Sequence, residues 1–435
     1  MNRTGPSPFW KSAGGILLAL LLAGGLAFTA HSVRKSWRLG DWSDASRQWE
    51  VCQYAKARVN PYELAFRLLR ETFGPAVGPE RIRLKEHRIY SVSTAQWRDQ
   101  PGVLPGHPPP EATYPPSSLA MLMPTIGWLP KPALLPLVSA VNLACLLLLI
   151  ATFAAWFRRE TSWSPAMAAG LAAALCLLWS PLQFAIENGQ FGVLVLLCAW
   201  SAIARLDRAP RLAGLLFMVA LVKPSLVLLF FFVPLVRWQW KPIWTAFLLG
   251  LLLTALPALW LQVWPWTLLA QWLGLCRYLL QGAFTLQEVL NALGWENTTR
   301  GVLVVLGVWS AVLAWCVAHR RARNAELFAF LALANLSWTY HERPDFTLLV
   351  FLPILFAAQL ADASRRRIAL PGLILSLVLG LALNDVFYVP DAAWAQAMRW
   401  AGRLSLPGLW SLAPPAVRPP PREPPPPAPI AGSPA

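Results

Sequence analysis

The chain has 435 residues, of which 56% are hydrophobic and only 13% are charged, and its 37 Lys and Arg against 21 Asp and Glu give a formal net charge of +16. A soluble domain carries about 25% charged residues, so a chain this poor in charge cannot cover a surface that faces water. The composition excludes a single soluble domain, a secreted disulfide scaffold and a disordered protein, and it leaves a membrane protein with many spans.

The first segments in chain order are a short basic start and an apolar stretch. Residues 1–12 are predicted to be a cytoplasmic N-terminus and 13–30 the first transmembrane helix. A cleaved signal peptide is the alternative for this stretch, whereas the many later spans favour a retained anchor. The polar segment 31–130 is then predicted to be an extracytoplasmic loop with amphipathic helices and, at 119–129, an apolar stretch that could re-enter the membrane.

The central part of the chain, residues 131–390, is predicted to be a bundle of transmembrane helices. Nearly charge-free runs recur there, and a helix needs about 17–25 mostly apolar residues to cross the bilayer. One run, 212–236, contains Lys223 at its centre and counts as two crossings, and the run 242–276 is too long for one. With the first helix, this predicts an all-α polytopic membrane protein of about eleven transmembrane helices.

The final segment, residues 391–435, is predicted to be extracytoplasmic. From residue 414 on it is rich in proline, which is typical of a disordered polyproline-type tail that cannot pack. A peptide ligand for SH3-like domains is the alternative to a plain solvated tail.

The charges of the short loops predict the orientation of the chain. One alternating set of loops carries thirteen Arg and Lys residues and the other set only four. Because cytoplasmic loops are rich in Arg and Lys, the first set is predicted to be cytoplasmic. The long first loop and the short polar segments around Asn188, Lys223 and His341 then lie on the outer side.

The long first loop contains three motifs that could carry chemistry. A segment with helical spacing, 45–58, follows Asp44, and either Ser43 or Asp44 can be its N-cap. Asp44 can instead be a carboxylate that accepts a proton as a catalytic base. Tyr62 stands in an Asn-Pro-Tyr motif that closes this segment, and Tyr114 precedes two prolines before the next apolar stretch. Both proline motifs can also be simple turns.

Two polar features interrupt the apolar bundle. Asn188 and Gln190 belong to a tight turn in which they could either satisfy helix ends or bind a ligand. Lys223 lies inside an apolar hairpin, where a cation costs about 2.5–3.5 kcal/mol unless it reaches water or a counter-charge. Lys223 is therefore a functional candidate, and snorkelling of its side chain to the interface is the alternative.

A late span ends at His341, which is followed by Glu342 and Arg343. A histidine here can be an interfacial bystander, a general base, or a phosphate ligand when it is charged. The sequence has no motif for nucleotide hydrolysis, dinucleotide binding or zinc proteolysis. The cytoplasmic loops and the first loop account for the net charge, so no nucleic-acid partner is predicted.

In their order along the chain, these motifs resemble the polytopic glycosyltransferases of family 87 (the DUF2029 group), which have the GT-C fold. The matching residues are Asp44 with Pro61-Tyr62, Tyr114-Pro115-Pro116, Gly189-Gln190, Lys223-Pro224 and Ser337-Trp338-Thr339-Tyr340-His341. Tyr340 stands where the family has the first of two histidines. The resemblance implies a GT-C-like helix bundle with a long first extracytoplasmic loop.

The resemblance also implies a function, which is inverting sugar transfer at the outer face of the cell membrane. The sugar, mannosyl or a related hexosyl or pentosyl group, would pass from a polyprenyl-phosphate donor to a hydroxyl of a lipid or glycan acceptor. No cofactor and no metal are implied. A transporter or lipid flippase is the main alternative from another class, since broken helices and a lysine within the membrane occur there too. A membrane scaffold that is recruited through the proline tail is a third.

The same resemblance gives each candidate residue a role. Asp44 would be the base, with His341 as its rival or partner, and Lys223 and Arg343 would bind the leaving phosphate. The remaining predicted contacts to sugar, phosphate or other parts of the substrates are Asn188, Gln190, Tyr62 and Tyr114.

Overall fold

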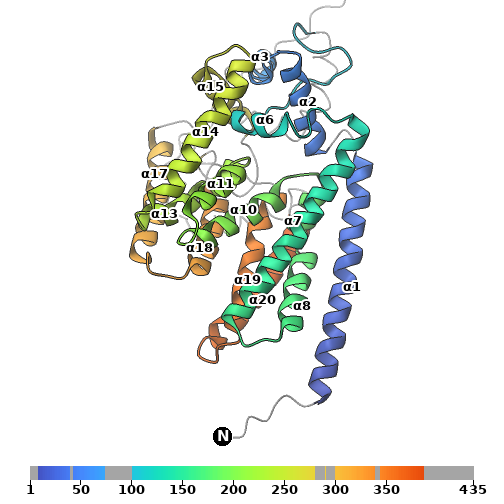
Figure 1. Cartoon of the computed structure of the whole chain (residues 1–435), viewed down its shortest axis with the longest axis vertical. Helices are drawn as coiled ribbons and strands as arrows, with labels where there is room; N and C mark the ends of the chain where they lie inside the picture. Colours follow the sequence, from blue (N-terminus) through green and yellow to red (C-terminus); the bar gives the residue numbers. More distant parts are fainter. Residues whose placement is uncertain are drawn as a thin grey trace, which may run out of the picture. The chain divides into compact units, whose positions relative to one another are not determined.

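The structure of the chain is a computed structural model that describes residues 8–39, 43–73, 100–279, 290, 299–338 and 343–386. In these ranges all regular elements are helices (Figure 1), which confirms the all-α class. One compact unit comprises Met1–Asn384, and only the first two residues of a second unit, Asp385–Ala435, are described. The proline-rich tail lies outside the described residues.

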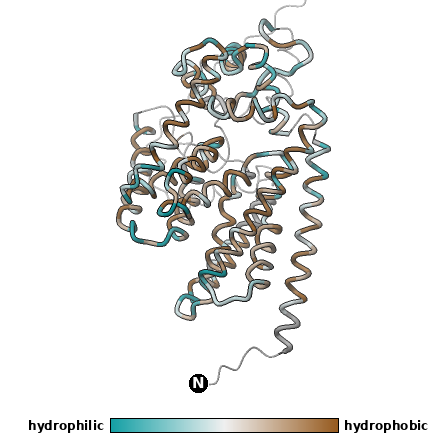
Figure 2. Tube along the Cα trace, in the orientation of Figure 1, coloured by the Kyte–Doolittle hydropathy of each residue, from teal (hydrophilic) through white to brown (hydrophobic). Residues whose placement is uncertain are grey.

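Several helices of the described chain are long and apolar enough to cross a membrane. They are α1 (Pro8–Leu39), α7 (Lys131–Glu160), α14 (Trp240–Trp260) and α17 (Thr299–Ala318). A further candidate is the pair α8 (Pro165–Leu178) and α9 (Ser180–Glu187), which is bent by 60°. Figure 2 shows hydrophobic residues along most of α1, α7 and α14 and polar residues in the connections. Four or five candidate spans are thus present in the described ranges, and the predicted count of eleven is not confirmed.

Short apolar helices occupy other parts of the predicted bundle. They are α10 (Gly192–Arg205), α11 (Pro210–Ala220), the series α12 (Pro224–Val227), η2 (Leu228–Phe231) and α13 (Phe232–Val236), α18 (Asn324–Trp338), and η3 (Arg343–Val350) with α19 (Phe351–Gln359). The run 212–236 breaks at Lys223-Pro224, since proline lacks the N–H that a continuous helix needs. Lys223 is the N-cap residue of α12. A helix of the bundle therefore ends and another begins at the lysine.

The first loop contributes helices to one end of the bundle (Figure 1). They are α2 (Asp44–Lys56), α3 (Pro61–Phe73) and α6 (Pro116–Leu122). The long run 242–276 divides into α14 and α15 (Pro265–Leu279), and α15 packs against α3 and α6. Indole N–H groups link the first loop to α14 and α15. Trp260 of α14 donates to the Ala55 carbonyl at 2.7 Å, and Trp272 of α15 donates to the Thr113 carbonyl at 3.1 Å.

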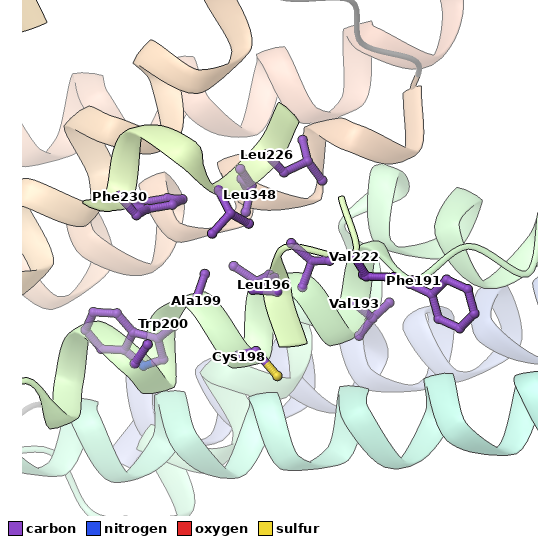
Figure 3. Packing of buried hydrophobic residues seen from close by; sticks show 14 of the residues in the cluster. Phe191, Val193, Leu196, Cys198, Ala199, Trp200, Val222, Leu226, Phe230 and Leu348 are labelled. Atoms are coloured by element: carbon purple, nitrogen blue, oxygen red, sulfur yellow. The ribbon is translucent and has the colours of Figure 1, made fainter. Parts of the chain in front are cut away.

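Buried aromatic rings fix the helices that carry the later site. Trp200 of α10 lies with its ring centroid 4.5 Å from that of Phe351 at the start of α19, and Phe351 lies 4.7 Å from Phe328 of α18. Figure 3 shows Trp200 in this core, together with Phe230 and with Leu348 of η3. Such ring pairs contribute about 0.5–1.5 kcal/mol each beyond the area they bury. They hold α10, α18 and α19 together, and α19 continues directly from η3. A residue of the later site lies near the start of α10 and another near the start of η3.

Gly214 permits a close contact between α11 and α14. A Cβ atom on Gly214 of α11 would lie 2.6 Å from the carbonyl oxygen of Pro242 in α14. No side chain fits there, so the two helices approach as closely as small residues allow in membrane bundles.

Candidate functional site

The geometry at the start of α2 bears on the two roles that the sequence left open for Asp44, N-cap and catalytic base. The N-cap of α2 is Ser43, whose hydroxyl accepts a hydrogen bond from the backbone N–H of Ser46 at 3.2 Å. Asp44 is the first residue inside the helix, and its own N–H donates to the carbonyl of Asn188 at 2.8 Å. The capping role thus belongs to Ser43, and the Asp44 carboxylate makes other contacts.

Tyr114 is one partner of that carboxylate. Its phenol O–H donates to Oδ2 of Asp44. The tyrosine is 6% exposed, and its ring centroid lies 6.0 Å from that of Phe191, the residue that precedes α10. A hydrogen bond to an ionised carboxylate is stronger than one between neutral groups, so Tyr114 fixes the orientation of Asp44 and stabilises its charged form.

A short polar segment, 111–114, lies along α2 and brings Tyr114 to this position. Glu111 forms an ion pair with Arg47 at 3.3 Å, and Gln48 donates to the Thr113 hydroxyl at 3.2 Å. Gln48 is 2% exposed. These contacts align the segment with the first turns of α2 on the same side as Asp44.

The turn after α9 connects Asp44 with the second half of the site. Asn188 is the C-cap of α9 and its amide donates to the Phe184 carbonyl at 2.9 Å, which is the helix-end role anticipated for it. Gly189 has a φ of +62°, which glycine adopts without strain. A Cβ atom there would lie 3.1 Å from Cβ of Ala45, so the turn packs directly on the start of α2.

Lys223 lies on the other side of this turn. Its Nζ donates to Oε1 of Gln190 at 2.6 Å and forms an ion pair with Oδ1 of Asp345 at 2.5 Å. The side chains of Lys223 and Asp345 are 11% and 6% exposed. The lysine has therefore found a buried counter-charge, and it does not follow the alternative of snorkelling to the interface.

Asp345 was not singled out in the sequence. It lies in the first turn of η3, and the neighbouring Phe346 carbonyl accepts a hydrogen bond from the Trp179 indole at 3.2 Å. A usable signal was present, since an acid near a lysine-bearing break is the partner that a charge within the membrane needs. Because Asp345 lies 122 residues from Lys223 in the chain, the sequence did not indicate this pairing.

The residues before η3 are only partly described. His341 lies outside the described residues, and of Arg343 only the backbone, at the start of η3, is described. Their roles as base and phosphate ligand therefore stay predictions. Asp345 follows His341 by four positions in the chain.

Tyr62 lies away from this group of contacts, in the packing between α3 and α15. It is 1% exposed, and burial raises the pKa of its phenol well above the ordinary value. Asn60 caps α3 by accepting from the N–H of Tyr62 at 3.1 Å, and its amide donates to Gln271 of α15 at 2.8 Å. The Asn-Pro-Tyr motif thus forms the turn and helix start that the sequence allowed, and a substrate contact for Tyr62 stays a prediction.

A second buried carboxylate, which sequence reasoning also missed, holds the first loop together. Glu50 of α2 lies 2.6 Å from Nδ1 of His107 and 3.1 Å from Nζ of Lys131 at the start of α7. Lys131 also lies over the Trp49 ring, with its Nζ 5.6 Å from the centroid. Glu50 is 4% exposed, so the cluster ties α2, the loop that leads to Tyr114, and α7.

We expect Glu50→Gln to lower the free energy of unfolding by about 1.5–3 kcal/mol, because charge-assisted hydrogen bonds to two basic groups are lost. Denaturant unfolding of the detergent-solubilised protein measures the change. Glu63→Gln, at an exposed carboxylate of α3, is the matched control and should be nearly neutral. Equal stability of the two variants would contradict a stabilising role of the cluster.

An apolar cavity of about 510 Å³ is lined by residues of α6, α11, η2, α14 and α15. Leu221 and Leu228, on either side of Lys223 in the chain, line it, as does Ser117, three residues after Tyr114. Phe247 and Trp266 also line the cavity and are 52% and 68% exposed, so it opens to the outer surface of the bundle. The described residues contain no cluster of three or more His, Cys, Asp or Glu side chains that could hold a metal ion.

Fold and site together define a class, an all-helical membrane protein with a charged, largely buried site and an apolar cavity. A sequence profile described as Glycosyltransferase family 87 matches residues 112–341, which is over half of the chain. The chain belongs to glycosyltransferase family 87 and is a membrane glycosyltransferase. Of the classes that the sequence left open, this family assignment selects the enzyme over a transporter, a flippase or a scaffold.

The matched region covers one part of the site directly. It contains Tyr114, Asn188, Gln190 and Lys223 and ends at His341, whereas Asp44, Tyr62, Arg343 and Asp345 lie beyond its ends. No curated protein and no solved structure matched the chain significantly.

Proposed function

We propose that this glycosyltransferase moves a sugar from a polyprenyl-phosphate donor to a hydroxyl group of a lipid or glycan acceptor, with inversion, at the extracytoplasmic face of the cell membrane. The observation that carries the proposal is that one turn joins a carboxylate to an ammonium group. Asn188 binds the backbone of Asp44, and Gln190 binds Lys223. The proposed base for the acceptor and the proposed cation for the donor phosphate are thus held by neighbouring residues.

In the proposed reaction, the acceptor oxygen attacks the anomeric carbon and loses its proton to a base. The bond between the anomeric carbon and the phosphate oxygen breaks, and the phosphate keeps the electron pair. Asp44 is the proposed base, with His341 as its rival or partner; a positioned base accelerates such a step about 10²–10⁴-fold. Developing negative charge on the phosphate calls for cations, for which Lys223 and Arg343 are proposed.

The cavity that Leu221 and Leu228 line supports a lipid-linked donor. Its walls are mainly apolar and it opens on the outer surface of the bundle near Phe247, where a hydrocarbon chain in the bilayer could enter. The phosphate of such a donor would then lie near the lysine while the chain occupies the cavity. Gln190 and Asn188 are the proposed contacts to sugar or phosphate.

Donor specificity tests the proposal most directly. The purified enzyme should transfer sugar from a polyprenyl-phosphate donor and not from a nucleotide sugar, because the sequence has no nucleotide-binding motif. Each radiolabelled donor is offered separately with a membrane-lipid acceptor fraction, and labelled product is measured. Turnover with a nucleotide sugar in the absence of polyprenyl phosphate would overturn the proposed donor class.

The proposed side of the membrane has its own test. Single cysteines are placed at Glu63 of α3 and at Arg321 between α17 and α18, both exposed, in a variant that lacks the native cysteines. The loop charges predict that Glu63→Cys reacts with a membrane-impermeant thiol reagent in intact cells, whereas Arg321→Cys reacts only after permeabilisation. The reverse pattern would place the site on the cytoplasmic side.

A further inference from the structure

The ion pair between Lys223 and Asp345 lies at the point where the proposed donor phosphate would bind. Both partners are largely buried, at 11% and 6% side-chain exposure, and the charged atoms are 2.5 Å apart. Gln190 accepts from the same ammonium group at 2.6 Å. Lys223 therefore has an anionic partner of its own, and a phosphate that approaches Lys223 also approaches the carboxylate of Asp345.

The charge on the phosphate changes during the proposed reaction. The donor is a phosphodiester with one negative charge, and the released polyprenyl phosphate is a monoester that carries close to two at pH 8, since its second pKa is about 6. The attraction to Lys223 that helps the bond break therefore also holds the product more tightly than the donor. An enzyme with only cations around the phosphate would release its product slowly.

We propose that Asp345 competes with the lipid phosphate for Lys223 and so promotes release of the polyprenyl phosphate product, an inference that rests on the proposed lipid-phosphate donor. Repulsion between Asp345 and the phosphate is stronger for the dianionic product than for the monoanionic donor. Because unit charges several ångströms apart in a protein still interact appreciably, the difference amounts to about one order of magnitude in affinity. Asp345 is thus a positioning residue for the ammonium group and sets the balance between donor binding and product release.

Inhibition by two probes tests this role on the purified enzyme at pH 8. Farnesyl phosphate stands for the dianionic product, and its methyl phosphodiester stands for a monoanionic lipid phosphate. The wild type should bind the two with inhibition constants within about three-fold of each other. In Asp345→Asn, which keeps the size and a hydrogen-bond acceptor, farnesyl phosphate should inhibit about ten-fold more tightly than in the wild type, and the phosphodiester should change less. Turnover should fall while the KM for the donor also falls.

A matched control is Glu50→Gln, which neutralises a buried carboxylate whose lysine partner is Lys131. It should leave the ratio of the two inhibition constants as in the wild type, and Asp345→Glu should restore that ratio. An unchanged ratio in Asp345→Asn would overturn the proposal. If Asp345→Asn does not fold, the two inhibition constants of the wild type still test the proposal. A wild type that binds farnesyl phosphate more than about ten-fold more tightly than the phosphodiester would show that Asp345 exerts no competition. A wild type that neither probe inhibits would overturn the proposed donor class itself.

Discussion

Replacing Asp44 by Asn should reduce turnover by about two or more orders of magnitude and leave the protein folded. Asn has the same size and can still accept the hydrogen bond from Tyr114, but it cannot take a proton from an acceptor hydroxyl at neutral pH. Helix α2 should be unaffected, because its cap is Ser43. Initial rates with saturating donor, together with thermal unfolding of the same preparation, measure both effects.

Ser43→Ala is the matched control for that experiment. It removes the cap hydroxyl next to Asp44 and should cost about 1 kcal/mol of stability while most of the activity remains. His341→Ala tests the rival assignment of the base. A fully active Asp44→Asn variant beside an inactive His341→Ala variant would move the base to the histidine.

Replacing Lys223 by Gln should have the largest effect on stability. The substitution removes the cationic partner of Asp345, whose side chain is 6% exposed, and loss of one member of a buried ion pair costs about 3–5 kcal/mol. The double variant Lys223→Gln with Asp345→Asn should recover much of this loss, since two amides can hydrogen-bond without a net charge. It should stay inactive, because the proposed phosphate ligand is absent.

Unfolding in denaturant compares the single and double variants, and initial rates measure their activity. Lys241→Gln, at an exposed lysine of α14, is the control and should change stability by less than about 0.5 kcal/mol. If Lys223→Gln were as stable as the control, the ion pair would not contribute to the fold. An active double variant would exclude Lys223 as a phosphate ligand.

Local patterns in the sequence were sufficient for the helical class and for several site positions. Apolar runs interrupted by Pro or by polar turns predicted the break at Lys223-Pro224 and the turn at Asn188–Gln190. Proline interrupts a helix at its own position, and a short polar run between two apolar runs indicates a turn there. Hydropathy alone did not separate short apolar helices from spans, as the bent pair α8 and α9 illustrates.

The pairings between distant residues could not be read from the sequence. Ser43 and Asp44 are both good cap residues, and only the position of Tyr114, 70 residues later, shows where the carboxylate is engaged. Asp345 and Lys223 are 122 residues apart, and no pattern in the sequence around either residue indicates the other as its partner. Such contacts depend on how the helices pack, which the order of apolar and polar residues does not determine.

The backbone also contributes to the electrostatics of the site, because several site residues lie at or near helix starts. Asp44 begins α2, Gln190 precedes the start of α10, and Asp345 lies in the first turn of η3. The contacts from Asn188 to Asp44 and from Lys223 to Gln190 and Asp345 bring these helix starts together. Each α-helix start carries a partial positive charge of about half a unit, from aligned peptide dipoles and N–H groups that lack partners within the helix. The backbone dipoles of α2 and α10 therefore offset part of the negative charge of Asp44, while Lys223 and Asp345 neutralise one another.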